Sequence, residues 1–221
     1  MNTSDLRPEK RALDLMVADG IRERILTGQL IPGSHLVEAD FTKEFDVSNG
    51  TVRAALRHLQ NEELVEFRPR RGMFVATLTS DDVRQLCSLR DSLEALAAKE
   101  AAGNGSAQEK LVLDDIMRSM TEAVKTHDPR CSELDLAFHK QIVKMSGNRK
   151  LIKVYGLLES QIRLFMAMAE PTHADFFADI MPLHAPIAEA VLSGDASRAY
   201  ELSAMHNQKD ADALAARIEA R

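Results

Sequence analysis

The chain has 221 residues, of which 45% are hydrophobic, and its formal net charge is −6 at pH 7. No apolar run approaches the roughly 18 residues that a membrane-spanning helix needs, no apolar signal segment opens the chain, and two isolated cysteines make no disulfide framework. We therefore expect a soluble, cytoplasmic, mainly helical protein without a membrane partner, because Ala, Leu, Met and Glu are abundant. An acidic chain gives no general indication of nucleic-acid binding. Whether it can bind DNA therefore depends on whether its basic residues share one surface.

The first third of the chain contains short elements in close succession. The segment "LDLMVADGIRERILTG" has apolar residues at helical spacing and ends on a glycine, and "LIPGSHL" contains a Pro-Gly turn. "VEADFTKEF" and "SNGTVRAALRHLQNEE" indicate two more helices, and the alternating runs 64–67 and 73–78 indicate a small β-hairpin. This order predicts a winged helix-turn-helix over residues 1–77.

The third helix and the hairpin tip gather polar and basic residues where such a domain meets DNA. Ser48 can cap the helix, Arg53 and Arg57 lie four residues apart on one face, and we expect the first turn to be exposed. The candidate DNA-contacting residues are Ser48, Asn49, Thr51, Arg53, Arg57, Arg70, Arg71 and Gly72. A solvated helix and a charged turn are the alternative, but the order of turn, cap and wing favours DNA.

These motifs resemble the DNA-binding domain of GntR-type bacterial transcription regulators. The matching pieces are "G-x-L-x-P-G-x-x-L-x-E", "V-R-x-A-L-x-x-L" and "R-R-G-x-x-V". After the serine, members usually have Arg-Thr-Pro, whereas this chain has Asn49, Gly50 and Thr51. Arginine favours guanine and asparagine favours adenine, so we expect the operator to differ from the common family sequence at that position.

Residues 80–221 indicate an all-α antiparallel helical bundle, because no strand-like alternation interrupts them. Short polar breaks such as "GNGS", "SGN" and "SGD" separate the helices, and Ser106 with Glu109 forms a capping box. The expected helices cover residues 80–102, 106–126, 131–145, 149–169, 174–192 and 195–219.

Several polar residues lie on the apolar faces of these helices. Asp135 and His139 are four residues apart, and His184, His206 and Arg90 each share a face with apolar neighbours. Burying such groups without partners costs several kcal/mol each. One carboxylate and three imidazoles form a ligand set for a divalent transition metal, Zn or Ni first, with Mn, Cu or Fe as alternatives.

Other interpretations of these residues stay open. A single inward histidine is more often a hydrogen-bonded core residue than a ligand, and it is the set of four that favours a metal. Glu189 and Glu201 are alternative ligands on faces that look more exposed, and the other four histidines receive no role.

This second segment resembles the effector domain, called FCD, of the FadR subgroup of GntR-type regulators. Members commonly show "D-x-x-F-H", a histidine before "A-x-x-x-G-D" and a histidine in the last helix, here "DLAFH", "HAPIAEAVLSGD" and "AMH". The resemblance implies a metal bound by Asp135, His139, His184 and His206, and a small carboxylate effector near Arg90. Six expected helices suggest the smaller variant of that fold.

The sequence thus predicts a homodimeric regulator, most simply a repressor, that binds double-stranded operator DNA under the control of a small organic acid. It predicts no enzymatic activity. The alternatives are a metal-dependent hydrolase, a regulator whose metal is purely structural, and a bundle without metal in which Asp135 and Arg90 form a buried pair.

Overall fold

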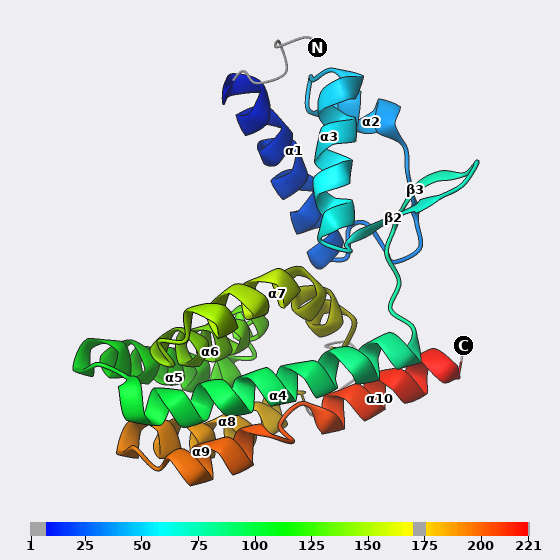
Figure 1. The fold of residues 1–221 in the computed structure, drawn as a ribbon. Coiled ribbons are helices and arrows are strands. Elements are labelled where there is room, and N and C mark those ends of the chain that lie inside the picture. Colours follow the sequence, from blue (N-terminus) through cyan, green and yellow to red (C-terminus); the bar gives the residue numbers. More distant parts are fainter. Residues whose placement is uncertain (1–7, 170–175, 221) are drawn as a thin grey trace. The chain divides into compact units, whose positions relative to one another are not determined.

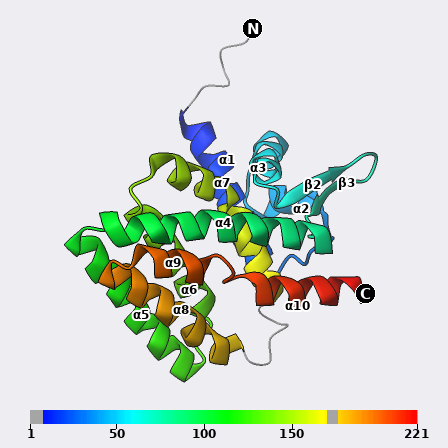
Figure 2. The ribbon, with the colours of Figure 1, turned by 60° about the horizontal axis from the view of Figure 1, so that its bottom comes forward.

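A computed structural model describes residues 8–169 and 176–220 of the chain, drawn in two views in Figures 1 and 2. The protein is mainly helical, as predicted, and forms two compact units. The first contains the chain as far as Leu78 together with Ser160–Ala167, and the second contains Thr79–Glu159 and the chain from Met168 onward. Among the described helices, none combines the length and apolar character needed to cross a bilayer.

The first unit is a winged helix-turn-helix with one strand more than the sequence predicted. Its elements are α1 (Pro8–Leu26), β1 (His35–Leu36), α2 (Glu38–Glu44), α3 (Asn49–Asn61), β2 (Val65–Arg68) and β3 (Gly72–Val75). The helix α3 packs against α1 and α2. The strands form an antiparallel sheet in the order β1-β3-β2, with His35 opposite Phe74. The Pro-Gly turn therefore leads into a short strand that the sequence analysis did not include.

The apolar stripe of α3 holds this unit together. Val52, Leu56 and Leu59 are completely buried, as their spacing predicted. Ser48 caps the helix, because its side chain accepts a hydrogen bond from the backbone N–H of Thr51. The buried stripe fixes which side of α3 is left to face outward.

The turn between β2 and β3 depends on backbone conformations that favour glycine. Arg70 and Gly72 have positive φ angles of 64° and 95°. A Cβ atom on Gly72 would also lie 2.9 Å from Nε2 of His35. Gly72 therefore has a structural reason to be glycine, and it keeps Arg70 and Arg71 at the tip of the wing.

The second unit is a helical bundle in which α4 is the central element. Its helices are α4 (Ser80–Asn104), α5 (Ala107–Thr126), α6 (Cys131–Met145), α7 (Arg149–Ala169, of which Ser160–Ala167 belongs to the first unit), α8 (Phe176–Ser193), α9 (Ala196–Ser203) and α10 (Gln208–Glu219). The helix α4 packs against α6, α8, α9 and α10, and α9 and α10 follow each other along its side in both views (Figures 1 and 2). The predicted capping box of Ser106 and Glu109 is present at the start of α5.

The prediction of a single last helix over 195–219, and so of six helices, is wrong. The described part of this unit has seven helices, because residues 204–207 form a turn between α9 and α10. The backbone N–H and the side-chain amide of Asn207 both donate to Oδ1 of Asp91, at 3.1 and 2.8 Å. These buried bonds to α4 replace helical ones, and sequence periodicity does not reveal them.

Candidate metal centre and nucleic-acid surface

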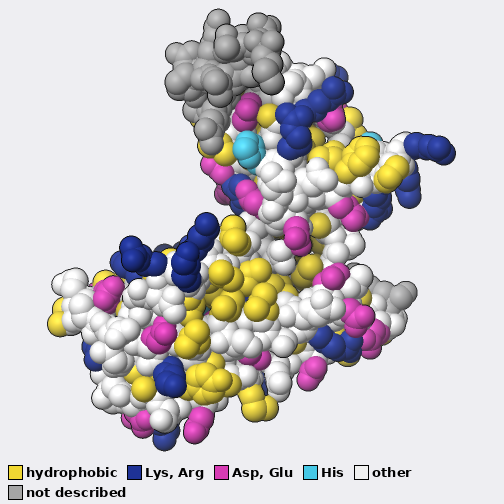
Figure 3. All heavy atoms as spheres, in the orientation of Figure 1, with side chains coloured by type: hydrophobic (Ala, Val, Ile, Leu, Met, Phe, Trp, Pro, Cys, Tyr) yellow, Lys and Arg dark blue, Asp and Glu magenta, His cyan; other side chains and the backbone are white. Residues whose placement is uncertain are grey.

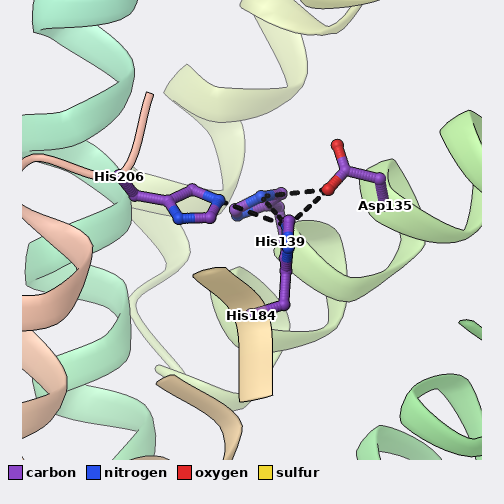
Figure 4. Close-up of side chains that lie close together, drawn as sticks. All are labelled: Asp135, His139, His184 and His206. Atoms are coloured by element: carbon purple, nitrogen blue, oxygen red, sulfur yellow. Dashed lines mark hydrogen bonds and ion pairs between the residues drawn. The ribbon is translucent and has the colours of Figure 1, made fainter. Parts of the chain in front are cut away.

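Two helices and one turn of the second unit bring four predicted ligands together. Asp135 and His139 extend from α6, His184 extends from α8, and His206 lies in the turn between α9 and α10; Figure 4 shows all four pointing toward one centre. One ligand atom from each residue lies within 4.8 Å of every other. The three imidazoles are buried. The four residues lie together, as a shared site requires, although His206 lies in a turn and not in the last helix where the sequence placed it.

The spacing of the ligand atoms fits a transition-metal ion. Nε2 of His184 lies 3.3 Å from Nε2 of His139 and 3.2 Å from Nε2 of His206. Metal–nitrogen bonds of about 2.0–2.1 Å in a tetrahedral site place neighbouring ligand atoms about 3.3 Å apart. Oδ1 of Asp135 contacts Nε2 of His184 and lies 3.8 Å from Nε2 of His139. The residues present therefore fit a divalent ion such as zinc.

Local hydrogen bonding aims His184 at the centre. Its Nδ1 atom lies 2.7 Å from the carbonyl oxygen of Ile180, one turn earlier in α8. Because a carbonyl only accepts hydrogen bonds, the ring hydrogen belongs on Nδ1, which leaves the Nε2 lone pair for a metal. A backbone carbonyl in this position is a common orienting partner of metal-binding histidines.

Electrostatics favour the metal-binding protonation states of Asp135, His139 and His206 and oppose that of His184. Burial would raise the pKa of Asp135, but the nearby imidazoles, His184 first, hold it well below its usual range. Burial lowers the pKa of His139 and lowers that of His206 further. At His184 burial is outweighed by Asp135, which raises the pKa. An ionised carboxylate beside neutral imidazoles is the form in which these groups bind metals.

Arg90 is buried in α4, as predicted, and its partner is a carboxylate that the sequence analysis missed. Its Nε and Nη2 atoms each lie 3.1 Å from Oε1 of Glu94. The other oxygen of Glu94 lies 3.2 Å from Nδ1 of His139. Arg90 is therefore one side chain removed from His139, a predicted metal ligand. The ion pair of Arg90 and Glu94 could have been predicted from the sequence, because the two residues have i, i+4 spacing on a helix.

The remaining polar candidates lie away from this cluster. Glu189 and Glu201 are exposed, as expected. His35 is tilted against the ring of Phe74 in the first unit, and His127 ends α5 in a left-handed conformation. His173 lies outside the described residues.

The first unit presents arginines on α3 and on the wing, and Figure 3 shows Lys and Arg side chains gathered there. Arg53 and Arg57 are exposed on α3, and Arg70 and Arg71 are exposed at the wing tip. Nε of Arg53 donates to Oε2 of Glu38 at 2.7 Å. An ion pair this exposed contributes little to stability, so Arg53 can exchange Glu38 for another anion at small cost.

The two polar residues of the first turn of α3 differ in exposure. Asn49 is exposed, and its Oδ1 accepts a hydrogen bond from the hydroxyl of Thr42 at 2.8 Å. Thr51 is only 3% exposed, and its hydroxyl lies 3.0 Å from the hydroxyl of Ser48. The prediction that Thr51 is exposed is therefore wrong: it completes the helix cap. A residue three positions after an N-cap faces that cap.

A winged helix-turn-helix followed by a helical bundle with a buried ligand cluster defines a class of DNA-binding transcription regulators. Residues 13–75 match the family of bacterial regulatory proteins called gntR, and residues 85–209 match the FCD domain. The chain belongs to the gntR family of regulators that carry an FCD domain. The resemblance stated from the sequence is confirmed.

Individual relatives agree with this assignment. The regulator BphR of Paraburkholderia xenovorans is 28% identical over 84% of this chain and 78% of its own length. The gluconate operon transcriptional repressor of Bacillus licheniformis is 26% identical over 93% and 87%. Among solved structures, E. coli McbR/YncC has a TM-score of 0.76 at 18% identity and covers 93% of this chain and 98% of that chain, which shows the shared fold.

The matched families and relatives are transcription regulators and not enzymes. Nothing in these comparisons therefore favours the metal-dependent hydrolase that was considered from the sequence.

Removal of two ligands should abolish metal retention. The double variant His139→Ala, His184→Ala leaves one imidazole and one carboxylate, too few for tight binding of a transition metal. We expect metal analysis of protein purified without chelator to find an ion in the wild type and none in the double variant. His58→Ala, which removes an imidazole from the first unit, is the control and should retain the ion. Full occupancy in the double variant would show that these residues are not the ligands.

Proposed function

We propose that the protein is a homodimeric repressor whose operator binding is controlled by a small organic acid at a metal centre in the FCD domain. The convergence of Asp135, His139, His184 and His206 carries the sensing half of this proposal. The exposed arginines on α3 and on the wing support the DNA-binding half. A protein that regulates transcription in a bacterium acts where the chromosome lies, so we place it in the cytoplasm.

In the DNA-binding half, α3 enters the major groove with its N-terminal residues first. Asn49 and Arg53 contact base edges, while Arg57 adds charge on the same face of the helix. Arg70 and Arg71 approach the phosphates or the minor groove from the wing, where Gly72 keeps the turn tight. Ser48 and Thr51 support these contacts by fixing the first turn of α3, with Ser48 close enough to the surface for its backbone to meet a phosphate.

The homodimer is proposed to form through an exposed apolar surface on α4 and α7. Figure 3 shows hydrophobic side chains gathered over these helices. We define the proposed α4–α7 surface as the exposed apolar residues of the two helices, which are Leu89 and Leu96 on α4 and Ile152, Val154 and Leu157 on α7; Leu157 alone is 69% exposed. Exposed apolar clusters of this kind mark protein interfaces, and a second copy supplies the second recognition helix that a pseudo-palindromic operator requires.

In the sensing half, the organic acid binds directly at the metal. When bound, the ion supplies open coordination positions for a carboxylate and a neighbouring hydroxyl. Arg90, held by Glu94 beside His139, is the proposed guanidinium partner of that carboxylate. The relative named as a gluconate operon repressor supports a sugar acid or hydroxy acid as the effector class. The effector changes operator binding only by its difference in affinity between the free and DNA-bound arrangements.

Loss of the Arg53 side chain should weaken operator binding. Arg53→Ala should cost about 1–3 kcal/mol if the side chain reads a base. The measurement is fluorescence anisotropy with a duplex selected by the wild-type protein from a random pool. Arg118→Ala, which removes an exposed arginine of α5 in the second unit, is the control and should bind as the wild type does. A folded Arg53→Ala variant with unchanged affinity would remove Arg53 from the interface.

A charge in the α4–α7 surface should break the dimer. Leu157→Glu would bury an unpaired carboxylate, which costs several kcal/mol, so sedimentation velocity should show mainly monomer at micromolar concentration. Leu111→Glu changes a similarly exposed leucine, 58% accessible, on α5 and should leave the dimer intact. Equal dimerisation of both variants would mean that the two copies meet elsewhere.

An acid should release the operator only when the metal is bound. We expect gluconate to weaken binding of the selected duplex by zinc-loaded protein by about 5- to 150-fold, the usual range of allosteric coupling. Glucose, which lacks the carboxylate, is the matched control and should have no effect. Zinc-depleted protein should not respond to gluconate. An equal response without zinc would favour the alternative in which the metal is structural and the effector binds elsewhere.

A further inference from the structure

Glu94 occupies a junction of buried hydrogen bonds in the middle of α4. Its Oε1 accepts from the hydroxyl of Tyr155 at 2.7 Å and from Nε of Arg90 at 3.1 Å. Its Oε2 accepts from Nδ2 of Asn207 at 3.0 Å and lies 3.2 Å from Nδ1 of His139. The guanidinium of Arg90 and the side-chain amide nitrogen of Asn207 can only donate, and each meets a different oxygen of Glu94. The carboxyl group of Glu94 therefore acts as an acceptor on both oxygens.

This acceptor decides which nitrogen of His139 carries the hydrogen. A neutral imidazole has one N–H and one lone pair, and the two forms differ in which nitrogen can bind a metal. A carboxylate beside Nδ1 favours hydrogen on Nδ1 and leaves the lone pair on Nε2. That Nε2 atom is the one that lies 3.3 Å from Nε2 of His184.

The same carboxylate also supports the turn that carries His206. Glu94 and Asp91, both on α4, hold Asn207, the residue that follows His206 in the chain. The backbone N–H of Asn207 is part of this contact, so the bonds fix the main chain beside His206 as well as a side chain.

We infer that Glu94 is a positioning residue of the metal centre, which sets His139 in its metal-binding tautomer and fastens the turn that carries His206. The inference rests on the metal centre proposed above. Partners of this kind typically contribute about 10- to 100-fold to metal affinity.

Glu94→Gln tests this role while keeping the size of the side chain. Arg90 and Tyr155 both donate toward Oε1, so the amide oxygen of Gln belongs on that side. The amide NH₂ group then faces Nδ1 of His139 and favours hydrogen on Nε2, the form that cannot bind the ion. Competition with a fluorescent zinc chelator should show zinc affinity about 10- to 100-fold below the wild type.

Glu100→Gln is the matched control for this variant. Glu100 is on the same helix, and its carboxylate also accepts from an amide, Nδ2 of Asn148 at 3.1 Å. It does not belong to the ligand cluster. Glu100→Gln should therefore bind zinc within threefold of the wild type.

The imidazole ¹⁵N chemical shifts of zinc-free protein give a second measurement that does not depend on metal affinity. The signals of His139, identified by their absence in His139→Ala, should show hydrogen on Nδ1 in the wild type and on Nε2 in Glu94→Gln. If Glu94→Gln does not fold, the wild-type spectrum alone tests the inference, because it shows which nitrogen of His139 carries the hydrogen.

Hydrogen on Nε2 of His139 in the wild type, or zinc affinity within threefold of the wild type in Glu94→Gln, would overturn the role of Glu94. Wild-type protein that binds no zinc would overturn the metal centre itself, so the two failures are distinguishable.

Discussion

The burial of one carboxylate and three imidazoles at a single point is the constraint on which the second unit depends. Each of these groups loses water on folding, and a buried polar group without a partner costs more than one apolar contact returns. Specific partners in the surrounding bundle offset this cost: the carbonyl of Ile180 contacts His184, and Glu94 contacts His139. Among the residues that the structure describes, the atoms that point inward make polar contacts only with one another, and their spacing suits a cation.

The central helix α4 joins the features that regulation would have to connect. It carries Glu94, which Arg90 holds beside His139, and Asp91, which together with Glu94 holds the residue after His206. It also contributes Leu89 and Leu96 to the proposed α4–α7 surface. It also follows β3 of the winged unit after residues 76–79. Occupancy of the metal centre, dimer contacts and DNA binding are therefore proposed to meet in one element. Coupling through it requires that the acid bind the free and DNA-bound arrangements with different affinities.

The sequence predicted the parts of this structure that depend on local periodicity. Helical spacing alone places Val52, Leu56 and Leu59 on one buried face of α3. It likewise brings Asp135 and His139, four residues apart, to the same side of α6. The capping box of Ser106 and Glu109 is local as well.

Features set by contacts distant in the chain were missed. The turn before α10 exists because Asn207 bonds to Asp91 across 116 positions of the chain, and no spacing rule encodes such a bond. The i, i+4 spacing could have revealed the pair of Glu94 with Arg90, but the role of Glu94 depends on Tyr155 of α7 and on Asn207 of the turn, both distant in the chain. Thr51 was misjudged for a local reason, because the cap made by Ser48 three residues earlier turns its hydroxyl inward.

X-ray absorption at the metal edge, on protein purified without chelator, tests the central claim most directly. The account predicts a first shell of nitrogen and oxygen at about 2.0–2.1 Å with multiple scattering from three imidazoles, as a site of one aspartate and three histidines requires. A spectrum without imidazole scattering, or one dominated by sulfur, would contradict the account.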